Sequence, residues 1–439
     1  MDEKYIKQMK NTNRIFISCI VMVLLASCSI QKKIAKEAKH DILNDSNFAA
    51  AHIGIALYDV AANKFVYNYQ GEKYFIPASN TKIMTCYAAM KYLGDSLVGL
   101  RYVDKGNGTI EVEANGDPTF LHPDFKNQPV FAFLKSKQNI LLTDNNWKEK
   151  GWGYGWAWDD YNSDYMAERS VMPVYGNTAP FNAEGKTVVR FFQKNVIGNN
   201  EQKSFNIKRE IASNRFIVTA SARKFTASDI PFYTAEKNLI ANLLIDTLKT
   251  KVEQEHFKLD RLPDVVKIHS QPTDSLLKIM MHRSDNFFAE QSLLMISNER
   301  LGVMSNEKII DTLLKTDYKD LPQKPKWVDG SGLSRYNLIS PQDFVAVLGK
   351  MKSEFEWNRI TTILPTGNEG TLAGLYKNYA GKIYAKTGTL SNNVALSGFI
   401  TTNKRHQYIF SVMVNNHQAS ASSIRHAIEN FIGSVIEKY

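Results

Sequence analysis

The sequence predicts an α+β protein in which a β-rich domain is inserted into a larger, discontinuous domain. Two alternating apolar segments predict a hairpin near the start of the folded part, and a helix follows it directly. Three more strand-like segments and a long amphipathic helix end the chain, and many short strand-like segments separated by turn signals lie between. The outer segments are residues 51–60 and 64–69 for the hairpin, 381–387, 396–401 and 407–415 for the later strands, and 420–438 for the last helix.

The first 27 residues are typical of an export signal. Four basic residues precede a twelve-residue apolar run, residues 15–26, which is too short to span a bilayer. The run ends in Leu25-Ala26-Ser27-Cys28, which resembles a bacterial lipoprotein signal and implies cleavage before Cys28 and a lipid on its sulfur. Residues 28–44 are then predicted to be a polar linker. The alternative is an ordinary signal peptide whose cleavage site contains a cysteine.

Length and composition narrow the classes of function. About 410 residues remain after cleavage, enough for two to three domains. The chain has 54 basic and 44 acidic residues, but no arginine-rich arm, so nucleic-acid binding is not expected. Nine histidines form no H-E-x-x-H motif and no cluster with cysteine, so neither a metal nor another cofactor is expected. Cys86 alone remains in the folded part, so we expect no intramolecular disulfide and a packing role for its thiol.

A candidate nucleophile lies at the first predicted helix. Pro77 interrupts the preceding structure, and apolar residues follow at helical spacing, so a helix begins at or beside Ser79. Ser79 and Lys82 are three positions apart and face the same side of that helix. A lysine in this position can accept the serine proton if it is neutral, and burial or a second nearby cation favours the neutral form.

Two further motifs distinguish Ser79 from the other serines. Ser-x-x-Lys occurs five times in the chain and is usually a helix cap, so the tetrapeptide alone is weak evidence. After Ser79, however, come Ser284-Asp285-Asn286 and then Lys386-Thr387-Gly388, in that order. Each of these alone is more often a helix cap or a strand end. Together they are typical of class A β-lactamases and penicillin-binding proteins.

The spacing of the motifs predicts the domain organisation. Ser79 and Ser284 must meet in one pocket although 205 positions separate them, so most of the interval has to form a domain of its own. We place this β-rich insert at residues 101–229, and the catalytic domain at residues 45–100 and 230–439. Four of the six tryptophans lie between positions 147 and 158. They could form a sugar-stacking platform, but the core of the insert is the favoured interpretation.

Matches to one family extend over most of the mature chain. The sequence resembles the D-alanyl-D-alanine carboxypeptidase/endopeptidase family, the class C low-molecular-mass penicillin-binding proteins. The resemblance implies a penicillin-binding/serine β-lactamase-like fold, an antiparallel sheet flanked by helices with a helical subdomain. The matching segments are residues 77–82, 115–118, 155–160, 284–291, 329–335, 364–365 with 370–372, and 385–390.

The same resemblance implies acyl transfer on peptidoglycan stem peptides and binding of β-lactam antibiotics. Ser79 would attack the carbonyl between two D-alanines or at a D-alanyl cross-link, with Lys82 as general base. Ser284 would pass the proton to the leaving amine, and Asn286 and Lys386 would shape the field around it. Thr387, Gly388 and Thr389 would line the substrate site. Lys386 and Thr387 would bind the terminal carboxylate of the substrate. The backbone N–H groups of Ser79 and Thr389 would donate to the oxyanion.

Two alternatives stay open at this point. One is a serine β-lactamase or esterase on the same fold, against which the 205-position gap argues. Rapid turnover of nitrocefin, rather than a lasting adduct, would favour it. The other is a catalytically silent lipoprotein that only binds peptidoglycan, which would release no D-alanine and bind no fluorescent penicillin. The sequence thus favours an exported, lipid-anchored, periplasmic enzyme, and leaves open its oligomeric state and its balance of carboxypeptidase and endopeptidase activity.

Overall fold

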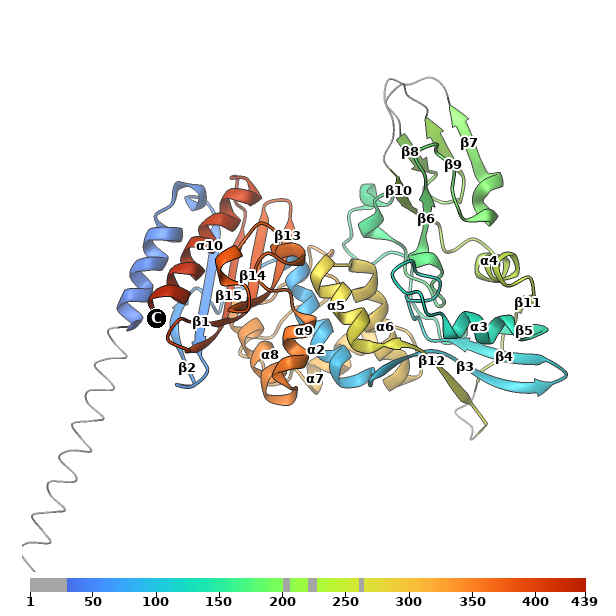
Figure 1. Ribbon diagram of the computed structural model, residues 1–439, viewed down its shortest axis with the longest axis horizontal. Coiled ribbons are helices and arrows are strands. Elements are labelled where there is room, and N and C mark those ends of the chain that lie inside the picture. The colour runs from blue at the N-terminus through green and yellow to red at the C-terminus, as the bar shows by residue number, and fades with distance from the viewer. Residues whose placement is uncertain (1–29, 200–205, 220–226, 260–263) are drawn as a thin grey trace, which may run out of the picture.

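The computed structural model describes residues 30–199, 206–219, 227–259 and 264–439 (Figure 1). The predicted export signal and the predicted lipidation site, Cys28, lie outside the described residues. In the described part of the chain, no helix has both the length and the apolar character needed to cross a bilayer.

One half of the molecule is built on an antiparallel five-stranded sheet. Its strands, in spatial order, are β13 (Ile383–Leu390), β14 (Asn393–Thr401), β15 (Gln407–Asn415), β1 (His52–Asp59) and β2 (Lys64–Tyr69). Helix α10 (Ala421–Lys438) packs on the face that carries Ile55, and helix α8 (Pro341–Glu354) packs on the face that carries Ala56. The predicted hairpin, later strands and final helix are all present, and pairing of β1 with β15 joins the two ends of the chain in one sheet.

The segment predicted to be a linker is helical. Residues 30–38 form an α-helix that continues as a π-helical turn, Lys39–Leu43. Ile34, Ala38 and Ile42 are completely buried in the core that α10 shares with the sheet. The linker prediction for residues 28–44 was therefore wrong for its described part, because an apolar stripe at four-residue spacing binds this segment to α10.

A layer of helices covers the other face of the sheet and separates it from the insert (Figure 1). It contains α2 (Lys82–Tyr92), α5 (Thr273–Arg283), α6 (Asn286–Leu301), α7 (Asn306–Lys315), α9 (Trp357–Ile363) and α8. Helix α2 follows a 3-10 turn, Ala78–Thr81, so the predicted helix start beside Ser79 is confirmed. Cys86 is buried in α2, and burial raises the pKa of its thiol to about 12, as expected for a packing residue.

The insert is built on a second five-stranded sheet. Its strands, in spatial order, are β11 (Lys251–Gln254), β5 (Asn139–Thr143), β4 (Thr109–Ala114), β3 (Ser96–Gly106) and β12 (Val266–Pro272). Helices α3 (Pro129–Lys135) and α4 (Leu239–Leu248) pack against it. Strands β3 and β12 pair antiparallel, and they are the strands by which the chain enters and leaves the insert.

The insert is therefore longer than predicted. The expected limits, residues 101 and 229, cut through β3 and omit α4, β11 and β12. Helix α4 was assigned to the catalytic domain, but its leucines belong to the core of the second sheet. Its amphipathic pattern shows that one side is buried without showing which sheet covers it.

Two small sheets extend the insert at the top of Figure 1. One pairs β6 (Thr178–Phe181) with β10 (Ser228–Pro231), and the other has β9 (Phe216–Thr219) between β7 (Val196–Asn199) and β8 (Asn206–Arg209). Not every strand-like segment of the insert is a strand: residues 188–192 have apolar residues typical of a strand, but a 3-10 helix, Arg190–Asn195, begins there and buries Phe192 among other aromatic rings.

Candidate active site

The three sequence motifs converge at one cleft between the sheet and the helical layer. Lys82 Nζ lies 2.8 Å from Ser79 Oγ and 2.6 Å from Asn286 Oδ1. Lys386 Nζ lies 2.8 Å from Ser284 Oγ. Residues from three distant parts of the chain thus form two adjacent serine–lysine pairs.

The turn that carries Ser79 is enclosed by two glycines from other segments. A Cβ atom at Gly388 would lie 2.5 Å from Pro77 O and 3.2 Å from the backbone nitrogen of Ser79. A Cβ atom at Gly332 would lie 1.9 Å from Ala78 O. Ala78 itself has a φ of 48°, an uncommon conformation for alanine. The Lys-Thr-Gly strand can approach the nucleophile turn this closely only because Gly388 lacks a side chain.

Lys82 is held in a buried, polar environment. Its side chain is completely buried, and Nζ also donates to Ser331 O at 2.8 Å. Burial lowers the pKa of Lys82 to about 8, although the carboxylates of Asp329, Asp285 and Glu290 act in the opposite direction. Roughly one tenth of Lys82 is therefore neutral at pH 7 and about half at pH 8, which supplies the neutral amine that a general base requires.

The second pair sits where α5 ends and β13 passes. Ser284 has a left-handed backbone conformation (φ 62°) that ends α5, and the Asp285 side chain then caps α6 by accepting from Phe288 N. Lys386 is completely buried, and burial together with the Lys82 cation lowers its pKa well below the usual range. The other oxygen of the Asp285 carboxylate, Oδ2, accepts a hydrogen bond from Arg283 Nη2 at 3.0 Å. Within the Ser-Asp-Asn motif, Asn286 therefore contacts Lys82 and Ser284 contacts Lys386, whereas Asp285 contacts neither lysine.

The remaining predicted site residues lie along β13. Thr387 is half-buried, Gly388 is buried against the nucleophile turn, and Thr389 is exposed at the mouth of the cleft. Thr389 Oγ1 accepts a hydrogen bond from Arg425 Nη2 at 2.8 Å. Strand β13 is at the edge of its sheet. Residues 365 and 366 pair with its outer edge at Tyr384 and Ala385, and beyond them the edge reaches the cleft at Thr389, where an extended peptide can pair with it.

A glycine-rich loop completes the support of Lys82. The carboxylate of Asp329 accepts from Gly332 N, from Ser334 N and from the Trp156 indole. Ser331 lies inside this loop. Its carbonyl oxygen accepts a hydrogen bond from Lys82 Nζ, and its backbone N–H donates to Glu290 Oε1 at 2.8 Å. Apart from the family match, the sequence of residues 329–335 predicts only a tight turn. It does not predict the contact between Ser331 and Lys82.

The insert also contributes to the cleft, which has a volume of about 470 Å³. Trp156, Asp160 and Tyr165 line it, and Tyr165 O accepts from Asn286 Nδ2 at 2.9 Å. The core interpretation of the tryptophans was therefore wrong for Trp156, and also for Trp158, which is 70 % exposed. Of the signals in the sequence, only the family match at residues 155–160 pointed to this segment.

Comparisons with known proteins agree with this geometry. The model of the D-Ala-D-Ala carboxypeptidase 3 (S13) family matches residues 35–435. The D-alanyl-D-alanine carboxypeptidase DacB of Haemophilus influenzae is 24 % identical over 84 % of this chain and 86 % of its own length. The D-alanyl-D-alanine carboxypeptidase of an Actinomadura species is 25 % identical over 87 % of this chain and 80 % of its own length.

Solved structures confirm the fold. Penicillin binding protein 4 (dacB) from Haemophilus influenzae has a TM-score of 0.73 at 19 % identity, over 92 % of this chain and 99 % of that one. The Bd0816 predatory endopeptidase of Bdellovibrio bacteriovorus has a TM-score of 0.51 at 16 % identity, over 88 % and 94 %. The predicted resemblance and the α+β penicillin-binding fold are thus confirmed, and the chain is a serine peptidase that belongs to the D-Ala-D-Ala carboxypeptidase 3 (S13) family.

Proposed function

We propose that Ser79 is the nucleophile of a D,D-peptidase that acts on peptidoglycan stem peptides and is acylated by penicillin. The observation that carries the proposal is the 2.8 Å separation between Ser79 Oγ and the buried Lys82 amine, next to the Ser284–Lys386 pair. An amide bond needs a nucleophile, an oxyanion trap and a proton donor for the departing nitrogen. The cleft offers a candidate group for each need.

In the proposed reaction, neutral Lys82 accepts the Ser79 proton while Oγ attacks the D-alanyl carbonyl. The oxyanion accepts hydrogen bonds from the backbone N–H groups of Ser79 and Thr389. Ser284 Oγ–H protonates the leaving nitrogen, and its proton is replaced from the buried amines. The C–N bond then breaks and leaves an acyl-enzyme on Ser79. Attack by water on this ester releases the shortened peptide and restores the serine.

The terminal carboxylate of the substrate is assigned to Thr387 and Lys386 at β13. Both carboxypeptidase and endopeptidase activity remain part of the proposal, since the two reactions differ only in what is attached to the leaving amine. Digestion of purified sacculi, followed by separation of the muropeptides, measures the two activities side by side. Loss of terminal D-alanine reports the first activity, and loss of cross-linked dimers reports the second.

The decisive experiment compares wild type with Ser79→Ala. Wild type should release D-alanine from a pentapeptide that ends in D-Ala-D-Ala and should be labelled covalently by fluorescent penicillin. Ser79→Ala should do neither. Ser275→Ala is a matched control, because Ser275 belongs to another Ser-x-x-Lys sequence and is exposed on α5. Rapid turnover of nitrocefin by wild type would instead identify a β-lactamase, and neither release nor labelling would leave only a binding protein.

The site of action is proposed to be the periplasmic face of a membrane, with the enzyme anchored through a lipid on Cys28. The support is the Leu25-Ala26-Ser27-Cys28 sequence after an apolar run. Cys28→Ser should abolish incorporation of a labelled fatty acid and move the enzyme from the detergent phase to the aqueous phase. Unchanged lipid labelling of Cys28→Ser would contradict the anchor without affecting the peptidase assignment.

A further inference from the structure

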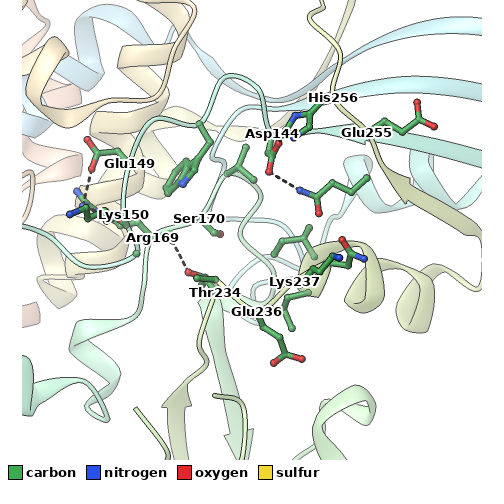
Figure 2. Close-up of a pocket in the computed structure, with 18 residues that line it drawn as sticks. Asp144, Glu149, Lys150, Arg169, Ser170, Thr234, Glu236, Lys237, Glu255 and His256 are labelled. Carbon is green, nitrogen blue, oxygen red and sulfur yellow. Dashed lines mark hydrogen bonds and ion pairs between the residues drawn. The ribbon is translucent and has the colours of Figure 1, made fainter. Parts of the chain in front are cut away.

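The insert contains a second cavity, of about 600 Å³, that includes none of the motif residues (Figure 2). It lies where the parallel strands β5 and β11 end, since Asp144 follows β5 and Glu255 follows β11. The chain that leads into α4, from Thr234 to Asn238, forms another wall. The space outside the carboxyl ends of parallel strands is where α/β units commonly bind ligands. Its volume is in the range of small-molecule sites.

The lining of this cavity fits an uncharged, hydroxyl-rich ligand. Four carboxylates and three permanent cations line the cavity, so their charges nearly cancel and a strongly charged ligand gains little. These groups are Asp144, Glu149, Glu236 and Glu255, and Lys150, Arg169 and Lys237. The half-buried Trp147 adds an aromatic surface. An aromatic ring beside carboxylate and amide groups is the combination that holds a sugar ring, by stacking and by hydrogen bonds.

Part of the lining is already fixed in place. Gln254 Nε2 donates to Asp144 Oδ2 at 2.7 Å, and Arg169 Nη2 lies 3.0 Å from Glu149 Oε2 (Figure 2). Asn238 is exposed and lines the cavity, so its amide is accessible to a ligand. A site with preset polar groups loses little side-chain entropy when a ligand binds.

Two short loops connect this cavity to the catalytic cleft. Met166 lines the cleft and Arg169 lines the cavity, so their Cα atoms are at most ~11 Å apart along the chain. On the other loop, Gly151 lines the cavity and Trp156 lines the cleft, and their Cα atoms are at most ~18 Å apart along the chain. The guanidinium carbon of Arg169 lies 5.5 Å from the centre of the Trp156 ring, so the two linings are in contact. An extended peptide of three residues covers ~10 Å. A ligand in the cavity and a peptide in the cleft can therefore belong to the same molecule.

We propose that the cavity around Trp147 binds an N-acetylated sugar of the glycan strand that carries the stem peptide being cleaved. This inference rests on the proposed function, because it takes the substrate to be a peptide attached to an amino-sugar polymer. The sugar would contribute affinity and would leave the chemistry at Ser79 unchanged. Its effect should therefore appear in KM, with kcat nearly constant.

The experiment compares two substrates that carry the same peptide. One is the free pentapeptide, and the other is the same pentapeptide attached to a disaccharide of N-acetylglucosamine and N-acetylmuramic acid. Wild type should show a KM that is about tenfold lower for the disaccharide form. Trp147→Ala and Gln254→Ala should remove this preference and leave kcat/KM for the free pentapeptide unchanged. Glu253→Ala, one position earlier on β11 and outside the lining, should keep the preference.

Direct binding gives a second measurement. A tetrasaccharide of N-acetylglucosamine should bind to wild type by calorimetry, and binding should weaken at least tenfold in Gln254→Ala. Gln254 is exposed, so this variant tests the site even if Trp147→Ala does not fold. Equal KM values for the two substrates in wild type would overturn the inference. If wild type released no D-alanine from the free pentapeptide, the proposed function would fail instead.

Discussion

Lys82 and Ser79 are joined by a contact of 2.8 Å in which the lysine amine is fully buried. Ser79 lies in the 3-10 turn Ala78–Thr81, and Lys82 is the first residue of α2. The Lys-Thr-Gly strand encloses the pair on one side and the loop of Asp329 on the other. Burial makes the charged form of Lys82 costly, while three carboxylates nearby limit the shift of its pKa to a value of about 8. The amine is therefore poised to lose its proton close to neutral pH.

The first prediction is a pH dependence of acylation. Only the neutral amine can accept the Ser79 proton, and with a pKa of about 8 roughly one tenth of Lys82 is neutral at pH 7. The rate of acylation by penicillin should therefore rise with pH, with a midpoint near pH 8. Stopped-flow measurement of acylation between pH 5.5 and 9.5 checks this. A rate that is already constant above pH 6 would exclude Lys82 as the base.

A second prediction concerns Glu290, which acts on Lys82 through charge and through Ser331. Glu290 is buried on α6 and holds Ser331 N, while Ser331 O accepts from Lys82. Burial and the neighbouring Asp329 raise the pKa of Glu290 to about 7, so it is largely ionised above that pH. Glu290→Gln removes a negative charge that favours the Lys82 cation. The midpoint of the acylation profile should therefore move to lower pH.

The control for Glu290 is the other carboxylate that pairs with Arg169. Arg169 Nη1 lies 3.3 Å from Glu290 Oε2, and Arg169 Nη2 lies 3.0 Å from Glu149 Oε2. Glu149→Gln also removes one partner of Arg169, but the carboxylates that act on Lys82 stay in place. Its acylation midpoint should match wild type. Identical midpoints for both variants would show that Glu290 acts only as a structural partner of Arg169.

The third prediction tests the close approach of β13 to the nucleophile turn. Gly388→Ala places a methyl group 2.5 Å from Pro77 O and 3.0 Å from Asn80 N, so the strand or the turn must move. A shift of this size at the oxyanion site should reduce acylation by ~10²-fold or more. Gly349→Ala on α8 is the matched control, because its Cβ would meet a single atom at 3.9 Å. The control should keep full activity and a similar melting temperature.

The catalytic motifs could be predicted from sequence because each is short and their order along the chain is distinctive. The approach of Ser79 to Lys82 follows from helical spacing, and the structure has this contact. The insert's contribution to the cleft could not be predicted in the same way. Trp156 and Tyr165 reach the cleft through irregular loops, whose paths depend on contacts far away in the sequence.

Two errors have physical explanations in the residues themselves. Residues 28–44 are rich in lysine, which predicts a linker, yet Ile34, Ala38 and Ile42 repeat every four residues and pack on α10. That spacing was visible in the sequence. The assignment of α4 to the catalytic domain was less avoidable, because two sheets compete for its apolar side. The pairing of β3 with β12 determines that α4 belongs to the insert. Residues far apart in the sequence form this pairing, so no local sequence pattern predicts it.

The last prediction concerns the stability of the insert, which depends on a buried ion pair. Arg209 on β8 is completely buried, and its Nη2 atom lies 3.0 Å from Glu168 Oε1. The Arg209 guanidinium also donates to four backbone carbonyls. Arg209→Met would leave the Glu168 carboxylate without its cation in a site where burial already raises its pKa. The variant should lose ~3–5 kcal/mol of unfolding free energy.

Arg215→Met provides the comparison, since Arg215 pairs with Glu210 at 3.1 Å but both side chains are exposed. An exposed pair contributes little, so this variant should stay within ~0.5 kcal/mol of wild type. Urea unfolding followed by far-ultraviolet circular dichroism measures both. The loss of stability in Arg209→Met should grow as pH rises above the ordinary carboxyl pKa of 4.5, because the unfolded chain then releases the Glu168 proton while the folded protein must keep it or bury an unpaired charge. Equal stability of the two variants would show that the buried pair is no stronger than the exposed one, and that Arg209 is held mainly by packing.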